Sequence, residues 1–217
     1  MTGSPPSDHP ERHAPTLGIG PGRLLAALAG VAVVVLLVVG LIQLAGSSSS
    51  SSSSTAPRLT LAQVKAKLAG SPAPLAALHA QANEILPADR QALDARIASL
   101  HGYPLVINKW ASWCIPCQDE RASFQHVSAA YGRTVAFLGV DSADTSRAEA
   151  RTFLAAYPQG FPSYFDKSGQ LGVAVTGSQF TPVTVFYDRA GHEYIHQGPY
   201  PNVAKLERDV RRYALDQ

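Results

Sequence analysis

Apolar residues in the second half of the chain occur either in continuous runs or at helical spacing. Continuous runs predict strands that are buried on both faces of a sheet; they cover 106–110, 134–140 and 183–188. Apolar residues spaced by three or four predict helices; these run from Cys114 to about Tyr131, from Asp144 or Thr145 to near Pro158, and from about Asn202 to Leu215. The alternation of these elements predicts an α/β fold over residues 101–217.

Two further segments complete this predicted domain. Residues 161–176 offer a short strand and a short helix, and 193–197 follows 183–188 as the second strand of an antiparallel hairpin. An antiparallel edge beside parallel strands predicts a mixed central sheet with helices packed on it.

The N-terminal part of the chain divides by composition into four segments. Residues 1–23 are rich in Pro, Gly and His and indicate a disordered tail, 24–45 is an apolar run, and 46–58 is a Ser-rich linker. Residues 59–100 carry apolar residues at helical spacing between prolines, which predicts a helical extension of three short helices. The expected bounds of these helices are about 59–69, 75–86 and 88–100.

The apolar run 24–45 predicts a transmembrane anchor. It contains no charged residue, and at about 1.5 Å per residue it is long enough to cross a hydrocarbon core of roughly 30 Å. Two arginines precede the run and no charge follows it before Arg58. This asymmetry favours a single pass with the N-terminus in the cytoplasm and the C-terminal domain outside. Cleavage near Ala45 is the alternative.

Cys114 and Cys117 are the only two cysteines of the chain, and Ile115 and Pro116 separate them. A thiol at the start of a helix is stabilised as a thiolate by the helix dipole and by unpaired backbone N–H groups, so that its pKa falls. The second thiol, one helical turn later, is placed to attack a mixed disulfide. The pair therefore predicts thiol–disulfide exchange, with Cys114 as the attacking thiol and Cys117 as the resolving thiol.

The cysteine pair has two other interpretations. A structural disulfide across so short a loop stabilises little, because the entropic gain grows with loop length. A zinc site needs four ligands, and neither His101 nor His126 adds a ligand pattern to the cysteines. His192 and His196 alternate along a strand without a third ligand, so no metal and no cofactor is expected.

The residues around the pair resemble a known family. Val106–Cys114 is an apolar strand that runs into the turn with the cysteines, and Thr181-Pro182 directly precedes the apolar strand 183–188. These motifs resemble the thioredoxin fold, and specifically the membrane-tethered TlpA/ResA-like thiol–disulfide oxidoreductases, over residues 100–216. The resemblance implies a thioredoxin-like sandwich, preceded here by the transmembrane helix and the short helical extension.

The resemblance implies roles for several residues. Cys114 and Cys117 match the redox pair of the family, and Trp113 and Pro116 match the motif residues around it.

Downstream, Pro182 matches the cis-proline that faces the disulfide in this fold. The resemblance implies that the backbone of Thr181 is presented there to a bound substrate strand. An ordinary trans proline at the start of a strand is the alternative.

Glu120 lies three residues after Cys117, on the same side of the predicted helix. Family members carry a glutamate here, and the resemblance implies that it tunes the cysteine pKa values or moves a proton; a surface glutamate is the alternative. Thioredoxin itself has a buried aspartate where this chain has Asn108, and an amide cannot act as an acid or base. Lys109 replaces the family's usual aromatic or apolar residue, and we expect its stem to cross the sheet with its charge in water.

Taken together, these features predict a membrane-anchored, extracytoplasmic oxidoreductase that acts on protein disulfides or dithiols and is recharged by a membrane electron donor. The family's usual association is with cytochrome c maturation or thiol reduction in the cell envelope, and it favours reduction over disulfide donation. A copper-binding chaperone and a redox-inactive binding module are the alternatives. The net charge of +2, with acids and bases interspersed, argues against nucleic-acid binding, and we expect a monomer.

Overall fold

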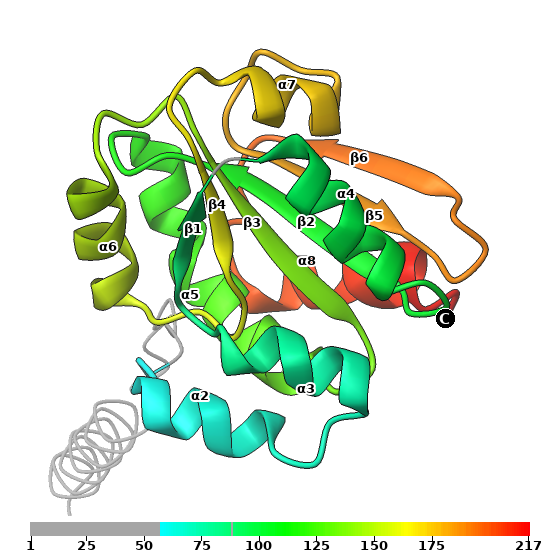
Figure 1. Ribbon diagram of the computed structural model, residues 1–217. Coiled ribbons are helices and arrows are strands. Elements are labelled where there is room, and N and C mark those ends of the chain that lie inside the picture. The colour runs from blue at the N-terminus through cyan, green and yellow to red at the C-terminus, as the bar shows by residue number, and fades with distance from the viewer. Residues whose placement is uncertain (1–56, 88) are drawn as a thin grey trace, which may run out of the picture. The chain divides into compact units, whose positions relative to one another are not determined.

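A computed structural model describes residues 57–87 and 89–217 (Figure 1). Within this part of the chain, a six-stranded sheet has the order β1-β4-β3-β2-β5-β6. The strands are β1 Ile85–Pro87, β2 Leu105–Trp110, β3 Ala136–Ser142, β4 Ser163–Asp166, β5 Val183–Tyr187 and β6 Glu193–Gln197. β1, β4, β3 and β2 are parallel, whereas β5 is antiparallel to both β2 and β6. The mixed sheet predicted from the sequence is therefore confirmed.

Helices cover both faces of this sheet (Figure 1). They are α2 Leu61–Leu68, α3 Ala73–Ala80, α4 Arg90–Ser99, α5 Ile115–Tyr131, α6 Arg147–Ala156, α7 Gln170–Thr176 and α8 Val203–Asp209, which continues as a π-helix over Val210–Ala214. The predicted hairpin at β5 and β6 and the short strand and helix at β4 and α7 are present. This sandwich has the thioredoxin-like arrangement that the sequence predicts.

β2 lies in the centre of the sheet, and all six of its residues are buried. Its side chains alternate between the two faces, as in any strand. Leu105 and Ile107 pack with α3, α4 and α7 on one face, while Val106 packs with α5 and α8 on the other. Asn108 and Trp110 therefore face α5, and Lys109 faces α7.

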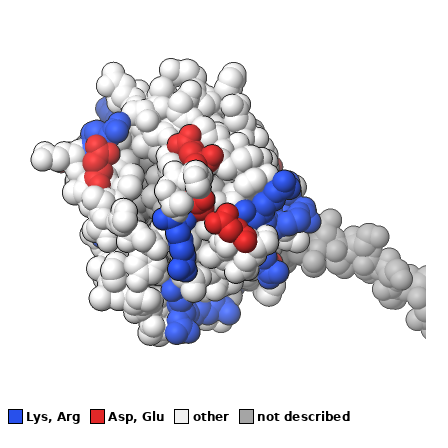
Figure 2. Space-filling model, turned by 90° about the vertical axis from the view of Figure 1, so that its right-hand side faces the viewer, with Lys and Arg blue, Asp and Glu red and all other residues white. Residues whose placement is uncertain are grey.

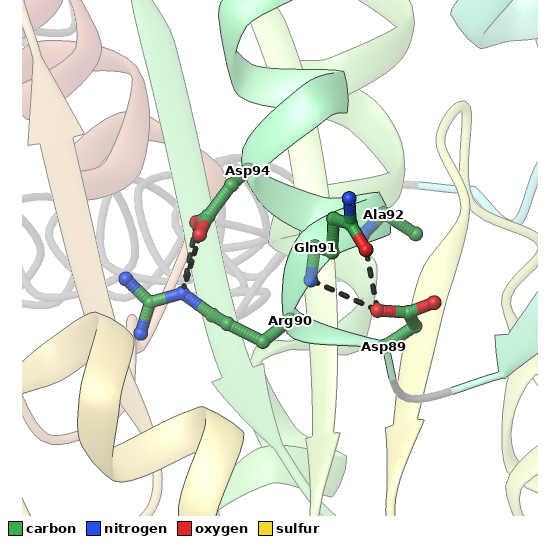
Figure 3. Close-up of polar contacts among 5 residues, drawn as sticks. All are labelled: Asp89, Arg90, Gln91, Ala92 and Asp94. Carbon is green, nitrogen blue, oxygen red and sulfur yellow. Dashed lines mark hydrogen bonds and ion pairs between the residues drawn. The ribbon is translucent and has the colours of Figure 1, made fainter.

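Several of the helices begin with a side-chain cap, and α4 is an example. Asp89 accepts hydrogen bonds from the backbone N–H groups of Gln91 and Ala92 at the start of α4, and Arg90 pairs with Asp94 one turn later (Figure 3). Such a cap satisfies backbone donors that have no partner within the helix.

The caps of α6 and α8 test two further expectations. Asn202 caps α8, where the last helix was expected to start. At α6 the prediction is wrong: Ser146, not Asp144 or Thr145, accepts the capping bond from Glu149. Asp144 is occupied elsewhere, as described below.

The segment that precedes β2 differs from its prediction in one element. Three short helices are present, but the expected helix 75–86 ends at Ala80, and Ile85–Pro87 forms the edge strand β1. β1 pairs in parallel with β4. The segment thus contains the three short helices predicted, but Ile85–Pro87, which was expected to end the second helix, joins the sheet instead.

Gln125 of α5 ties the start of this segment to the domain. Its side chain accepts a hydrogen bond from the backbone N–H of Leu59 and donates to the carbonyls of Leu59 and Pro158. Gln125 is completely buried, so these bonds hold the chain entering α2 against α5.

The predicted tail, anchor and most of the linker, over residues 1–56, lie outside the described residues. Within residues 57–87 and 89–217, no helix is both long and apolar enough to cross a membrane. On the face of the domain shown in Figure 2, basic and acidic side chains are interspersed and much of the surface is uncharged.

Candidate functional site

Cys114 and Cys117 form a disulfide at the start of α5, with their Cα atoms 5.2 Å apart. Cys114 is the N-cap of the helix, and its Sγ accepts a hydrogen bond from the backbone N–H of Cys117 at 3.2 Å. The same N–H would stabilise a thiolate on Cys114 after reduction, as would the positive end of the helix dipole. Pro116, in the first turn of the helix, suits a position whose N–H has no helical partner.

The loop before β5 faces this disulfide. The Thr181–Pro182 peptide bond is cis, and the carbonyl oxygen of Thr181 lies 3.7 Å from Cys114 Sγ. The structure thus brings Thr181 and Pro182 beside Cys114, although 67 positions separate Thr181 from this cysteine.

The surface around the disulfide is apolar. Trp113 is 57% exposed, Ile115 72% and Phe180 74%. Two of these side chains flank Cys114 in the sequence, and Phe180 directly precedes Thr181. Exposed large apolar side chains that gather in this way are typical of a docking surface. Sequence reasoning identified Trp113 but missed Ile115, the first residue of α5, and Phe180, since an apolar residue in a loop or at a helix end carries no signal of its exposure.

Glu120 is buried behind the disulfide. Its carboxylate accepts a hydrogen bond from Asn108 Nδ2 at 2.9 Å and another from the backbone N–H of Tyr200 at 3.0 Å. Burial raises the pKa of Glu120 to about 8, although both hydrogen bonds act to lower it. Glu120 is therefore not a surface glutamate, and near neutral pH its carboxyl is able to take up or release a proton.

Glu120 and Cys117 line the same small cavity, of about 10 Å³. This volume is close to the roughly 10–15 Å³ that one water molecule needs. Glu120 and Cys117 therefore border a space about the size of one water molecule. Asn108, which also lines the cavity, holds the carboxyl but has no proton to exchange. Tyr200 contributes through its backbone, so no sequence signal could have identified it.

Lys109 differs from its prediction. The sequence suggested a stem that crosses the sheet with the charge in water, but the residue is only 2% exposed. Its Nζ donates a hydrogen bond to the carbonyl of Ser178 at 2.7 Å. Burial lowers the pKa of Lys109, while the charge of Asp166 acts to raise it. The prediction is wrong because α7 and the loop after it cover this strand end, which the strand's own residues do not reveal.

Two carboxyl groups that sequence reasoning did not assign to the site support the disulfide loop. Asp144 accepts hydrogen bonds from the backbone N–H of Ser112 at 2.7 Å, from Ser112 Oγ at 2.9 Å and from the backbone N–H of Thr145 at 2.7 Å. Burial acts to raise the pKa of Asp144, but the hydrogen bonds from Asp141, Ser112 and Thr145 outweigh it and hold the pKa below its usual value.

Asp141 lies beside Asp144 with its side chain fully buried. Within the described residues, neither of its carboxylate oxygens accepts a hydrogen bond from a donor. Burial raises the pKa of Asp141 to about 9, and the neighbouring Asp144 adds to the shift. Asp141 is therefore protonated at neutral pH and donates to Asp144. An acidic residue inside the apolar strand 136–142 is the signal that could have identified it.

The histidines of β6 and the turn before it do not gather around a common point. His192 Nδ1 pairs with Asp188 at 2.7 Å, and the ring of His196 packs against Tyr200. Across residues 57–87 and 89–217, no three His, Cys, Asp or Glu side chains are arranged so that they could hold a metal ion.

Two curated proteins similar to this chain are named as a thioredoxin-like protein and as a thiol-disulfide oxidoreductase. The thioredoxin-like protein YneN of Bacillus subtilis is 33% identical over 70 residues, which are 31% of this chain and 41% of YneN. The thiol-disulfide oxidoreductase ResA of Oceanobacillus iheyensis is 29% identical over 76 residues, which are 35% of this chain and 40% of ResA. The chain thus matches about two fifths of the length of these relatives. No family model matches the chain.

Among solved structures, the chain is similar to MTB DsbF, with 28% identity and a TM-score of 0.47 over 52% of this chain and 83% of DsbF. It is also similar to a protein described as a thiol:disulfide interchange protein DsbE, from Chlorobium tepidum, with 27% identity and a TM-score of 0.48 over 54% of this chain and 83% of that protein. The curated relatives confirm the resemblance predicted from the sequence: the chain is similar to thioredoxin-like thiol–disulfide oxidoreductases.

Proposed function

We propose that this chain is a membrane-anchored, extracytoplasmic thiol–disulfide oxidoreductase that reduces disulfides in other polypeptides. The observation that carries the proposal is the Cys114–Cys117 disulfide at the start of α5, with the Thr181 carbonyl beside the Cys114 sulfur and Glu120 lining the same small cavity as Cys117. The names of the curated relatives support the same chemistry.

The reaction starts from the reduced pair. The Cys114 thiolate attacks one sulfur of a substrate disulfide, so that a Cys114–substrate disulfide forms and the other substrate sulfur leaves as a thiolate. Cys117 then passes its proton toward Glu120 and attacks Cys114 Sγ. The Cys114–Cys117 disulfide forms and the second substrate thiol is released. The substrate gains two electrons and the chain loses two, which a dithiol donor at the membrane restores.

The residues around the disulfide have distinct roles in this proposal. An extended substrate segment adds as a strand to the partly exposed backbone of Thr181, which Pro182 orients, and Trp113 provides an apolar contact beside the reacting sulfur. Pro116 fixes the first turn of α5. Disulfide donation would use the same residues in reverse, and the reduction potential decides between the two directions.

Trapping the mixed disulfide tests the chemistry. Cys117→Ser removes the resolving thiol, so we expect a covalent adduct between Cys114 and a substrate cysteine, seen as a reducible band on a non-reducing gel. Cys114→Ser is the matched control and should trap nothing. If Cys117→Ser yields no adduct with any disulfide substrate, the catalytic proposal is wrong and a passive binding module takes its place.

The reduction potential of the full chain in detergent tests the direction. A value near that of thioredoxin, roughly −270 mV, supports a reductant, whereas a value near −120 mV supports disulfide donation. Tight copper binding that either cysteine variant abolishes, without disulfide exchange, would instead support a metal chaperone.

A further inference from the structure

A cavity of about 400 Å³ opens beside the disulfide, on the side of α7. Its lining includes Trp113 from the disulfide loop, Thr181 from the loop before β5, and Lys109, Ser142, Gln170 and Gln179. A water molecule takes up about 30 Å³ of the liquid, so the cavity has room for a whole amino-acid side chain. A substrate segment lying along Thr181 would pass the mouth of this cavity.

The side chain of Lys109 lines this cavity and lies beneath α7. Gly172 lets the helix lie directly on the lysine stem, since a Cβ there would come within 2.9 Å of Lys109 Cε and 2.3 Å of Ser142 Oγ. The side chain then reaches the loop after α7, where its Nζ bonds to the Ser178 carbonyl. Only this hydrogen bond engages Nζ within the described part of the chain, whereas an ammonium group has three N–H donors.

The charge of Lys109 has no direct counterion among the described residues. The carboxylate of Asp166 is near enough to act on Lys109, but the two groups do not form an ion pair within 4.0 Å. Asp166 instead accepts hydrogen bonds from the backbone N–H of Gly172 at 2.8 Å and from Ser168 Oγ at 3.0 Å. A buried charge is costly unless it is paired and hydrogen-bonded. Lys109 therefore still has donors for an anionic partner.

We propose that this cavity is a substrate subsite that receives a glutamate or aspartate side chain, whose carboxylate pairs with Lys109. The proposal rests on the proposed function, because the acidic residue would lie near the cysteine that Cys114 attacks. Uncharged polar side chains, Gln170 and Gln179, line the rest of the wall and can hydrogen-bond to the same carboxylate. The subsite would make the enzyme selective for disulfides in acidic sequence contexts.

Equilibrium binding to the oxidised full chain tests the subsite without electron transfer. The probes are peptide pairs in which serine replaces the cysteine, and glutamate or glutamine occupies each flanking position in turn. At one position we expect the glutamate peptide to bind about tenfold more tightly, as a charge-assisted hydrogen bond allows. Titration calorimetry gives the ratio of the two dissociation constants.

Variants of Lys109 separate charge pairing from a structural role. Lys109→Met removes the charge and the donor, whereas Lys109→Gln removes the charge and keeps an N–H donor for Ser178. We expect both variants to lose the glutamate preference and to bind the glutamine peptide as the wild type does. Lys65→Met, which removes an exposed lysine of α2 that does not line the cavity, should keep the preference.

Two results would overturn the subsite: a glutamate-to-glutamine ratio near one at every position, or a preference that survives in both Lys109 variants. Reduction of the corresponding disulfide peptides distinguishes this failure from failure of the proposed function. Reduction without a glutamate preference would support the proposed function and contradict the subsite. A binding preference without any reduction would support the subsite and contradict the proposed function.

Discussion

At the scale of single residues, Glu120 shows how burial controls the protonation of a carboxyl group. Its pKa is about 8 in the fold against an ordinary value of 4.5, so the folded chain binds this proton more tightly than the unfolded chain does. The resulting stability is fully present below pH 4.5 and is lost as the pH rises toward 8. In the proposed mechanism, function and stability depend on the same carboxyl, because the burial that raises the pKa of Glu120 also makes it costly to ionise.

Glu120→Gln should remove this pH dependence. We expect the unfolding free energy of the wild type, minus that of the variant, to fall by about 3 kcal/mol between pH 5 and pH 8. Urea denaturation of the oxidised chain at a series of pH values measures the difference. Glu84→Gln, at an exposed glutamate, is the control and should show no such trend. A difference that stays constant with pH would contradict the assigned pKa.

Asp141 and Asp144 are adjacent carboxyl groups for which we expect opposite effects. Asp141 must take up a proton to be buried at pH 7, whereas Asn needs none and still donates to Asp144. We therefore expect Asp141→Asn to raise the unfolding free energy at pH 7 by about 2 kcal/mol. Asp144→Asn should lower it by about 2 kcal/mol, because two backbone donors lose a charged acceptor. Denaturation of both variants at pH 7 tests this, and changes of the same sign would refute it.

At the scale of elements, α5 both presents the disulfide and anchors the N-terminal segment. The disulfide is at its first turn, and Gln125, further along the helix, binds both backbone groups of Leu59. α2 packs on this helix through Val64 and Leu68, which form a small cluster with Ala129. The segment before β2 is therefore part of the folded domain rather than an independent appendage.

Gln125→Ala should loosen this attachment. The change leaves partly buried backbone groups at Leu59 and Pro158 without their partner, so we expect the unfolding free energy to fall by about 2 kcal/mol. Hydrogen exchange should accelerate in α2 while β2 and β3 stay protected. Gln91→Ala, at an exposed glutamine of α4, serves as the control. Equal acceleration in α2 and the central strands would argue against a local attachment.

At the scale of the whole molecule, the proposed function requires the sulfur pair to act outside the membrane. We expect the full chain to stay with membranes after washing at high pH, because residues 24–45 are apolar and free of charge. A chain that starts at Arg58 should appear in the soluble fraction. In intact cells, a membrane-impermeant thiol reagent should label the reduced cysteines of the full chain. Labelling only after lysis would show that the cysteines lie in the cytoplasm and would contradict the proposed orientation.

Much of the sheet could be predicted because β2, β3 and β5 are mainly apolar and buried. The predicted helix at Cys114 begins within one residue of α5. β1 could not be predicted: Leu75, Leu78, Ala82 and Ile85 have helical spacing, and only pairing with β4 makes Ile85–Pro87 a strand. The cap of α6 was predicted wrongly for a related reason. Asp144 accepts hydrogen bonds from Ser112, which is far away in the sequence, and does not cap the helix.

The sequence alone determined the candidate chemistry of this protein, because two cysteines separated by two residues at a predicted helix start favour thiol–disulfide exchange over the other interpretations. It also determined the order of the strands and helices from β2 onward, since local apolar periodicity is visible without knowledge of neighbouring segments. Only the tertiary structure decided how Glu120, Asp141 and Lys109 behave. Their pKa values and partners depend on burial and on contacts between segments far apart in the chain, such as Glu120 with Tyr200 and Lys109 with Ser178.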